Sequence, residues 1–153
     1  MIRVLFVCLG NICRSPMAEA VFMHKVRAVG LEEAISADSA GTGGWHAGEP
    51  PHSGTRGVLA KYGIAYAGRA RQIARADLAE FDYIITMDDQ NFRDVQQMGF
   101  GKAHVARFLD NAPQTGVREV PDPYYDGGFE GVYRLVEAAA DGLLAAIRKD
   151  HGI

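Results

Sequence analysis

The chain has 153 residues, of which 48% are hydrophobic and 23% charged, and its formal net charge is −3 at pH 7. This length predicts a single domain, residues 1–153, with enough apolar material for one buried core. The slightly negative charge argues against a nucleic-acid-binding protein, because such proteins concentrate basic residues on one face. The apolar runs fall short of the 18 or more residues that a membrane-spanning helix needs, so we expect no membrane partner.

The cysteine content indicates the compartment. Only Cys8 and Cys13 are present, and no signal-peptide pattern precedes the first apolar run. Two cysteines are too few for the disulfide scaffold of a small secreted protein, so we expect a cytoplasmic protein. The one basic cluster, Arg69, Arg71 and Arg75, is interpreted as a solvated loop or helix end, with a basic rim beside a cleft as the alternative.

The chain begins with an apolar, β-branched run at 2–7, which predicts a strand buried on both faces. From Pro16 onward, apolar residues recur at helical spacing until Gly30, a residue type that commonly ends helices. Ser15 is interpreted as the N-cap of this helix and Pro16 as its first residue. The loop 8–15 would then lie at the carboxyl end of a central strand.

The rest of the chain continues to alternate strand and helix. We expect strands at 34–39, 83–87 and 104–109, and helices at 55–62, 75–80, 89–97 and 131–149. The glycine-rich segment 40–54 is long for a loop, and its Trp45 either lines a cleft or covers the edge of the core. This alternation predicts an α/β fold in which helices cover both faces of a parallel sheet. Ligands of such folds bind beyond the carboxyl ends of the strands.

The loop 8–15, with the sequence CLGNICRS, has the features of a phosphate-binding site. Backbone N–H groups in such a loop can converge on an anion, and glycine and asparagine permit the reversals that this requires. The phosphate-binding residues would be Leu9, Gly10, Asn11, Ile12, Cys13 and Arg14. The Arg14 guanidinium can bind two oxygens of a tetrahedral anion, and the positive end of the following helix points at the same place.

Cys8 at the start of this loop is the candidate nucleophile. Helix N-termini and nearby cations lower the pKa of a thiol, so a cysteine here would be a thiolate near neutral pH. The alternative, a small buried hydrophobic residue at a strand end, is the commoner role of a free cysteine. The phosphate-binding features around Cys8 favour the nucleophile.

Cys8 and Arg14 are separated by five residues and followed by Ser15, and this pattern resembles the signature of the low-molecular-weight protein tyrosine phosphatases. The resemblance covers the whole chain, through DSAGTGGWHAGEPP, ARQI, FDYIITMD and PDPYYDG in the family's order. It implies a single-domain three-layer sandwich with a four-stranded parallel sheet in the order 2-1-3-4. It also implies a monomeric phosphatase without cofactor or metal, which hydrolyses phosphotyrosine or aryl phosphates through a phosphocysteine intermediate and has a cognate tyrosine kinase.

The resemblance also assigns the catalytic roles. Cys8 would be the nucleophile, Arg14 the phosphate clamp and Asp122, in DPYYD, the general acid and base. Without the resemblance, the candidate acids would be Asp88, Asp89, Asp122 and Asp126, all of residue types that also form turns and caps. Asp88 and Asp89 are interpreted as structural and capping residues at the start of the helix 89–97.

Further positions match those that support the family's site. Asn11, Ser15 and Ser39 would hold the loop in shape, and Leu9, Trp45, Tyr124 and Tyr125 would form an aromatic cleft, with ordinary packing as the alternative. Gly68 replaces a histidine that often joins the loop-supporting network, which would leave its donor role vacant or filled by water. Cys13 would form a reversible disulfide with Cys8, as in relatives, with simple packing as the alternative.

Two other functions stay open. Arsenate reductases share the loop but pass electrons through further cysteines, and residues 16–153 contain none. A non-catalytic phosphate-binding module would use the loop but would need neither Cys8 nor Asp122. The histidines form no metal-binding motif and are interpreted as surface or loop residues; they are His24, His46, His52, His104 and His151.

Overall fold

The structure, a computed structural model, describes residues 1–153 and contains one four-stranded parallel sheet. Its strands are β1 (Ile2–Cys8), β2 (Ile35–Gly41), β3 (Tyr83–Thr86) and β4 (His104–Arg107). They lie in the order β2-β1-β3-β4, which confirms the expected order 2-1-3-4. The central strand β1 pairs with β2 and β3, and its residues from Val4 to Val7 are inaccessible to solvent, as a strand covered on both faces must be.

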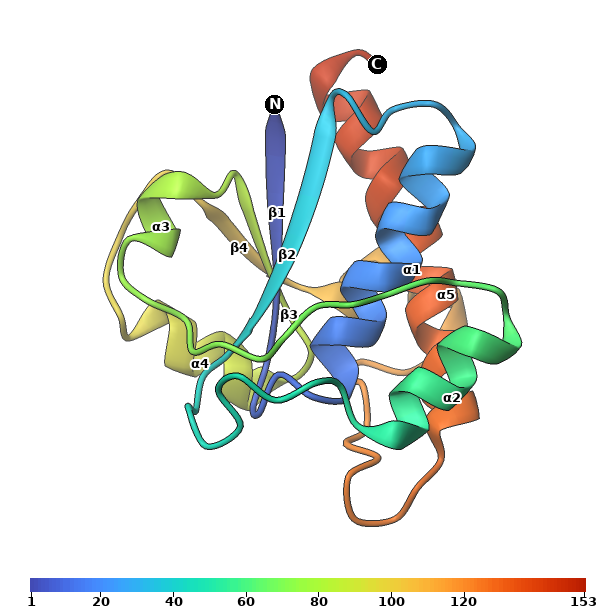
Figure 1. Ribbon diagram of the computed structural model, residues 1–153. Helices are drawn as coiled ribbons and strands as arrows, with labels where there is room; N and C mark the ends of the chain where they lie inside the picture. The colour runs from blue at the N-terminus through green and yellow to red at the C-terminus, as the bar shows by residue number, and fades with distance from the viewer.

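Helices lie on both sides of the sheet and complete three layers (Figure 1). The helices α1 (Arg14–Ala28), α2 (Ser53–Lys61) and α5 (Phe129–His151) lie on one side, and α3 (Asp77–Glu80) and α4 (Asp89–Gln96) lie on the other. Side chains of β1 alternate between the two layers. Phe6 packs in the larger core beneath α1 and α5, edge to face with Phe22 and Phe108, whereas Leu5 and Val7 belong to the smaller core on the α3 and α4 side.

Two local expectations are wrong. The strand expected at 104–109 ends at Arg107 and is followed by two 3-10 turns, η1 (Phe108–Asn111) and η2 (Pro113–Thr115). Phe108 and Leu109 both point into the larger core, which successive residues of a strand cannot do. The helix α1 begins at Arg14, and Ser15 is not its N-cap, because the Ser15 hydroxyl is bonded to the loop before the helix.

The parallel strands place their carboxyl ends at one edge of the sheet. Three connections gather there: the loop after β1, the glycine-rich segment after β2 and the segment between η2 and α5 (Figure 1). This is the edge at which ligands of parallel α/β folds bind. None of the helices is both long and apolar enough to cross a membrane.

Candidate active site

The loop between β1 and α1 wraps around the sulfur atom of Cys8, and the Cys8 residue is only 3% exposed. The backbone N–H of Asn11 donates to Sγ at 3.3 Å, and the Ser15 hydroxyl lies 3.0 Å from Sγ. Asn11 adopts φ = 58°, a left-handed conformation that asparagine tolerates better than most residues. Because of this reversal, the Asn11 N–H turns back toward the sulfur. The loop thus places a backbone N–H and a hydroxyl against the Cys8 sulfur.

The Asn11 side chain holds the loop on two sides. Its Nδ2 donates to the Ser15 hydroxyl at 2.8 Å, and its Oδ1 accepts from the Arg71 backbone N–H at 3.0 Å. The segment around Arg71 runs beside the end of β2, where Gly41 and Gln72 form a β-bridge. Nothing in the alternation of strands and helices indicated this extra pairing. The hydrogen bonds therefore agree with the loop-supporting positions expected for Asn11 and Ser15.

The basic cluster does not form a rim around the site. The Arg71 guanidinium binds the carboxylates of Asp38 and Asp77, each at 3.0 to 3.1 Å, on the α3 side of β2. Asp77 is buried, and Arg71 compensates its charge. Since none of the three arginines of the cluster lines the cavity at Cys8, the alternative interpretation as a basic rim is wrong.

Arg14 lies beneath the same loop and is 3% exposed. Its Nη1 donates to Asp88 Oδ2 at 2.8 Å and to the Val120 carbonyl at 3.0 Å, and its Nη2 lies 3.5 Å from Asp122 Oδ2. Burial opposes the positive charge, but the Cys8 sulfur and the two carboxylates outweigh burial and raise the pKa of Arg14. The guanidinium is therefore charged and fixed in orientation.

Asp88 has a role beyond the expected cap. Its Oδ1 accepts from the Asn91 backbone N–H in a capping box at the start of α4, as expected for this residue. Its other oxygen holds Arg14. The sequence carries an indirect signal for this contact, because Asp88 follows β3 and Arg14 follows β1, and β1 and β3 are neighbours in the sheet.

Asp122 lines the cavity above Cys8. Cys8, Arg14 and Asp122 all border one cavity of about 360 Å³. Among the four candidate acids, Asp122 is the one that reaches this cavity. Its Oδ1 accepts from the Tyr124 backbone N–H at 3.1 Å, which orients the carboxylate, and the side chain stays 34% exposed.

Aromatic side chains form the walls of this cavity. Leu9, Trp45, Tyr124 and Tyr125 all line it, together with His46, for which no role was expected. Trp45 is 72% exposed, so it borders the cavity rather than covering the core edge. His46 lies against Gly10, and its Nδ1 is 2.9 Å from Glu49 Oε2. The only sequence signal for His46 is its position beside Trp45.

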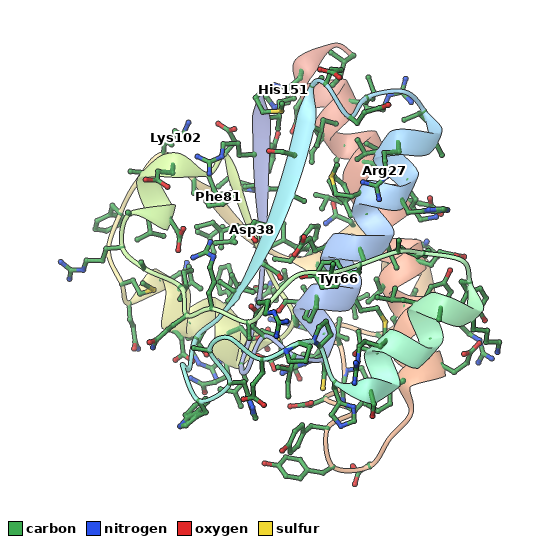
Figure 2. The ribbon with its side chains drawn as sticks, viewed as in Figure 1. Arg27, Asp38, Tyr66, Phe81, Lys102 and His151 are labelled. Atoms are coloured by element: carbon green, nitrogen blue, oxygen red, sulfur yellow. The ribbon has the colours of Figure 1, made fainter.

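Ser39 bonds away from the catalytic loop. Its hydroxyl donates to Glu19 Oε1 at 2.7 Å, and the Tyr66 hydroxyl donates to the same oxygen at 2.8 Å (Figure 2 shows Tyr66 beside α1). A Cβ atom at Gly68 would lie 2.1 Å from the Tyr66 hydroxyl oxygen. Tyr66 therefore occupies the space into which a residue-68 side chain would project. Its hydroxyl donates to Glu19 and makes no hydrogen bond with Asn11 or Ser15.

The Tyr66 hydroxyl is expected to stabilise the fold through Glu19. Burial raises the pKa of Glu19, and the donors Ser39 and Tyr66 partly oppose this. Tyr66→Phe removes one donor from a partly buried carboxylate, so the free energy of unfolding at pH 7 should fall by about 1 kcal/mol in urea titrations. Because the pKa of folded Glu19 lies above its unfolded value and rises further in this variant, the loss should shrink as the pH falls and Glu19 becomes protonated.

Glu19→Gln is the matched control for this experiment. The amide oxygen can accept both hydrogen bonds that Oε1 accepts, without the partly buried charge. This variant should be less destabilised than Glu19→Ala, and Tyr66→Phe in its background should lose the pH dependence. An unfolding free energy of Tyr66→Phe equal to that of the wild type at pH 7 would contradict the assignment.

The two cysteines of the loop are not equivalent. Cys13 is buried against Ile12 and Ala70, and both cysteines are free. Burial raises the pKa of the Cys13 thiol to about 12, with further contributions from Cys8 and Asp122 that outweigh Arg14. Cys13 is therefore a thiol at neutral pH. The disulfide between them stays a prediction.

The arrangement offers a nucleophile, a cation for a tetrahedral anion and a carboxyl group around one cavity, which are the groups that phosphoryl transfer requires. No three His, Cys, Asp or Glu side chains come together anywhere in the chain as ligands for a metal ion.

The comparisons with known proteins agree with this chemistry. Residues 3–152 match the family described as low molecular weight phosphotyrosine protein phosphatase. The chain is 52% identical over 153 residues to the low molecular weight protein-tyrosine-phosphatase YfkJ of Bacillus subtilis, covering 98% of both chains. It is 45% identical over 154 residues to a low molecular weight protein-tyrosine-phosphatase of Streptomyces coelicolor, covering 96% and 94%. It matches the crystal structure of YfkJ with a TM-score of 0.95 at 50% identity, covering 98% and 96% of the two chains. The chain therefore belongs to the low molecular weight protein tyrosine phosphatase family.

Proposed function

We propose that this protein hydrolyses phosphotyrosine and small aryl phosphates through a phosphocysteine intermediate, and that residues 1–153 form one phosphatase domain. The observation that carries the proposal is the meeting of Cys8, Arg14 and Asp122, from three segments of the chain, around one cavity. It is supported by relatives that are named protein-tyrosine-phosphatases and that match this chain over nearly their full length.

In the first step, the Cys8 thiolate attacks phosphorus in line with the leaving oxygen. The P–S bond forms, the P–O bond to the phenol breaks, and Asp122 gives its proton to the leaving oxygen. Arg14 and the loop N–H groups would balance the charge on the three equatorial oxygens. Because Asp88 and the Val120 carbonyl hold Nη1, the guanidinium needs little reorganisation when phosphate binds.

In the second step, Asp122 acts as a base. Its carboxylate takes a proton from a water molecule, and the resulting hydroxide displaces sulfur from phosphorus. Inorganic phosphate leaves, and Cys8 returns to the thiolate, in contact with the Ser15 hydroxyl and the Asn11 N–H. Asp122 is protonated again and ready for the next substrate.

The walls of the cavity favour a phosphorylated phenol over a phosphorylated alcohol. Phosphotyrosine places a flat ring between its phosphate and its backbone, and Trp45, Tyr124 and Tyr125 line the cavity that Cys8 borders. Aromatic pairs gain about 0.5 to 1.5 kcal/mol beyond simple burial. Phosphoserine has no ring to use these contacts.

The chemistry also suggests where and with what the protein works. A catalytic thiolate must stay reduced, so we place the protein in the cytoplasm. Cys8, Arg14 and Asp122 of one chain suffice for the proposed steps, so the mechanism requires no partner subunit and we take the protein to act as a monomer. Phosphotyrosine proteins are made by tyrosine kinases, so a cognate kinase would supply the substrate.

The test is hydrolysis of p-nitrophenyl phosphate and of matched phosphotyrosine and phosphoserine peptides in EDTA. We expect hydrolysis of p-nitrophenyl phosphate and of the phosphotyrosine peptide without added metal, and much slower hydrolysis of the phosphoserine peptide. Strict dependence on an added metal ion, or equal turnover of both peptides, would contradict the proposal.

A further inference from the structure

A second cavity adjoins the catalytic cavity on the other side of Trp45. Its volume is about 330 Å³, and Leu9 and Trp45 line both cavities. It lies between the glycine-rich segment after β2 and the helix α4, at the same edge of the sheet as Cys8 (Figure 1). A substrate bound at Cys8 can therefore extend into it over Leu9 and Trp45.

The lining of this second cavity is apolar on one side. Trp45, Ile73 and Met98 contribute to it, and the Trp45 ring lies directly over Gly43, where a Cβ atom would come within 1.7 Å of the ring. Gly43 thus permits this position of the ring, which remains largely exposed. An exposed indole face is the best aromatic partner for a cation, and it also packs against aliphatic chains.

One carboxylate completes the lining. Asp94, on α4, accepts a hydrogen bond from Gln90 Nε2 at 2.8 Å and takes part in none of the ion pairs of the chain. No lysine or arginine lines the cavity. The charge of Asp94 therefore has no cationic partner in a cavity that Trp45 also lines. Such a lining suits a cation on an apolar stem and repels an acidic group.

We propose that the second cavity binds the side chain of a lysine or arginine close to the phosphotyrosine in a protein substrate. The stem of that residue would lie along Trp45 and Met98, and its cation would lie near the indole face and Asp94. This inference rests on the proposed function and deepens it, because it names a class of phosphotyrosine sequence that the enzyme prefers. The residue would lie within about three positions of the phosphotyrosine, the reach of a short extended backbone.

The test compares phosphotyrosine peptides that carry lysine, norleucine or glutamate at each of these positions. At one position, lysine should raise kcat/KM about two- to fivefold over norleucine, the effect of a partly exposed ion pair, and glutamate should lower it. Added salt should reduce the lysine effect. Asp94→Asn should abolish the preference for lysine, and Asp94→Lys should reverse it in favour of glutamate.

Two controls make the result specific. Glu32→Gln removes the same charge from an exposed position in the turn before β2, at the other end of the sheet, and should leave the preference intact. Hydrolysis of p-nitrophenyl phosphate, which has no neighbouring residues, should be unchanged in the Asp94 variants. A preference that persists in Asp94→Asn, or no lysine preference at any position while p-nitrophenyl phosphate is hydrolysed, overturns this inference alone. Failure of the wild type to hydrolyse either substrate class overturns the proposed function and this inference with it.

Discussion

Cys8→Ser should reduce kcat for p-nitrophenyl phosphate by on the order of 10⁴-fold or more, because it replaces the nucleophile. A serine hydroxyl at this position would stay protonated at neutral pH, and no base in the loop can remove its proton. The two groups that contact Sγ, the Asn11 N–H and the Ser15 hydroxyl, are not general bases. The variant should still bind phosphotyrosine peptides, since Arg14 and the loop N–H groups are unchanged.

The measurement is steady-state hydrolysis together with peptide binding by calorimetry. The matched control is Cys13→Ala, which removes the other thiol of the loop. Because Cys13 is a thiol at neutral pH, with its pKa raised to about 12 by burial, this variant should keep most of the activity. Substantial turnover by Cys8→Ser, or loss of turnover only in Cys13→Ala, would exclude Cys8 as the nucleophile.

Asp122→Asn is expected to lower kcat for a phosphotyrosine peptide by about 10² to 10⁴-fold, the usual contribution of general acid catalysis. The asparagine can accept the Tyr124 N–H through its amide oxygen, as Asp122 Oδ1 does, so the loop should keep its conformation. The loss should be smaller for p-nitrophenyl phosphate, because p-nitrophenolate leaves more readily without a proton. A loss that depends on the leaving group separates proton donation from a purely structural role.

Asp126→Asn provides the control for Asp122. Asp126 lies in the same segment and is exposed, but it does not line the cavity. This variant removes the same charge and should leave both substrates nearly unaffected. Equal losses in the two variants, or the same loss for both leaving groups in Asp122→Asn, would assign the acid role elsewhere.

Local sequence alone determines the strand, loop and helix around Cys8. The apolar run of β1, the tolerance of Asn11 for positive φ and the apolar spacing of α1 act between near neighbours, and the structure shows all three. The alternation of strands and helices likewise predicts a parallel sheet, since crossover connections constrain its topology. The exact sheet order came from the resemblance of motifs along the whole chain.

Local patterns do not encode the long-range contacts of the loop around Cys8. Arg14 contacts Asp88, Val120 and Asp122, which lie 74, 106 and 108 residues along the chain. The sequence identifies Asp122 as the general acid only through the family resemblance. It predicts that Asp88 caps a helix, but it does not predict the contact between Asp88 and Arg14. These pairs form because β1 and β3 are neighbours and the segment before α5 folds back over their carboxyl ends.

The sequence of this protein by itself predicts a nucleophilic cysteine in a phosphate-binding loop, because that loop is built from neighbours in the chain. Only the tertiary structure decides that Ser15 turns toward Cys8 instead of capping α1, that Tyr66 occupies the space beside Gly68, and that Asp94 faces a second cavity. Each of these depends on how distant elements pack, and a side chain's partner is set by the surface that packing brings to it.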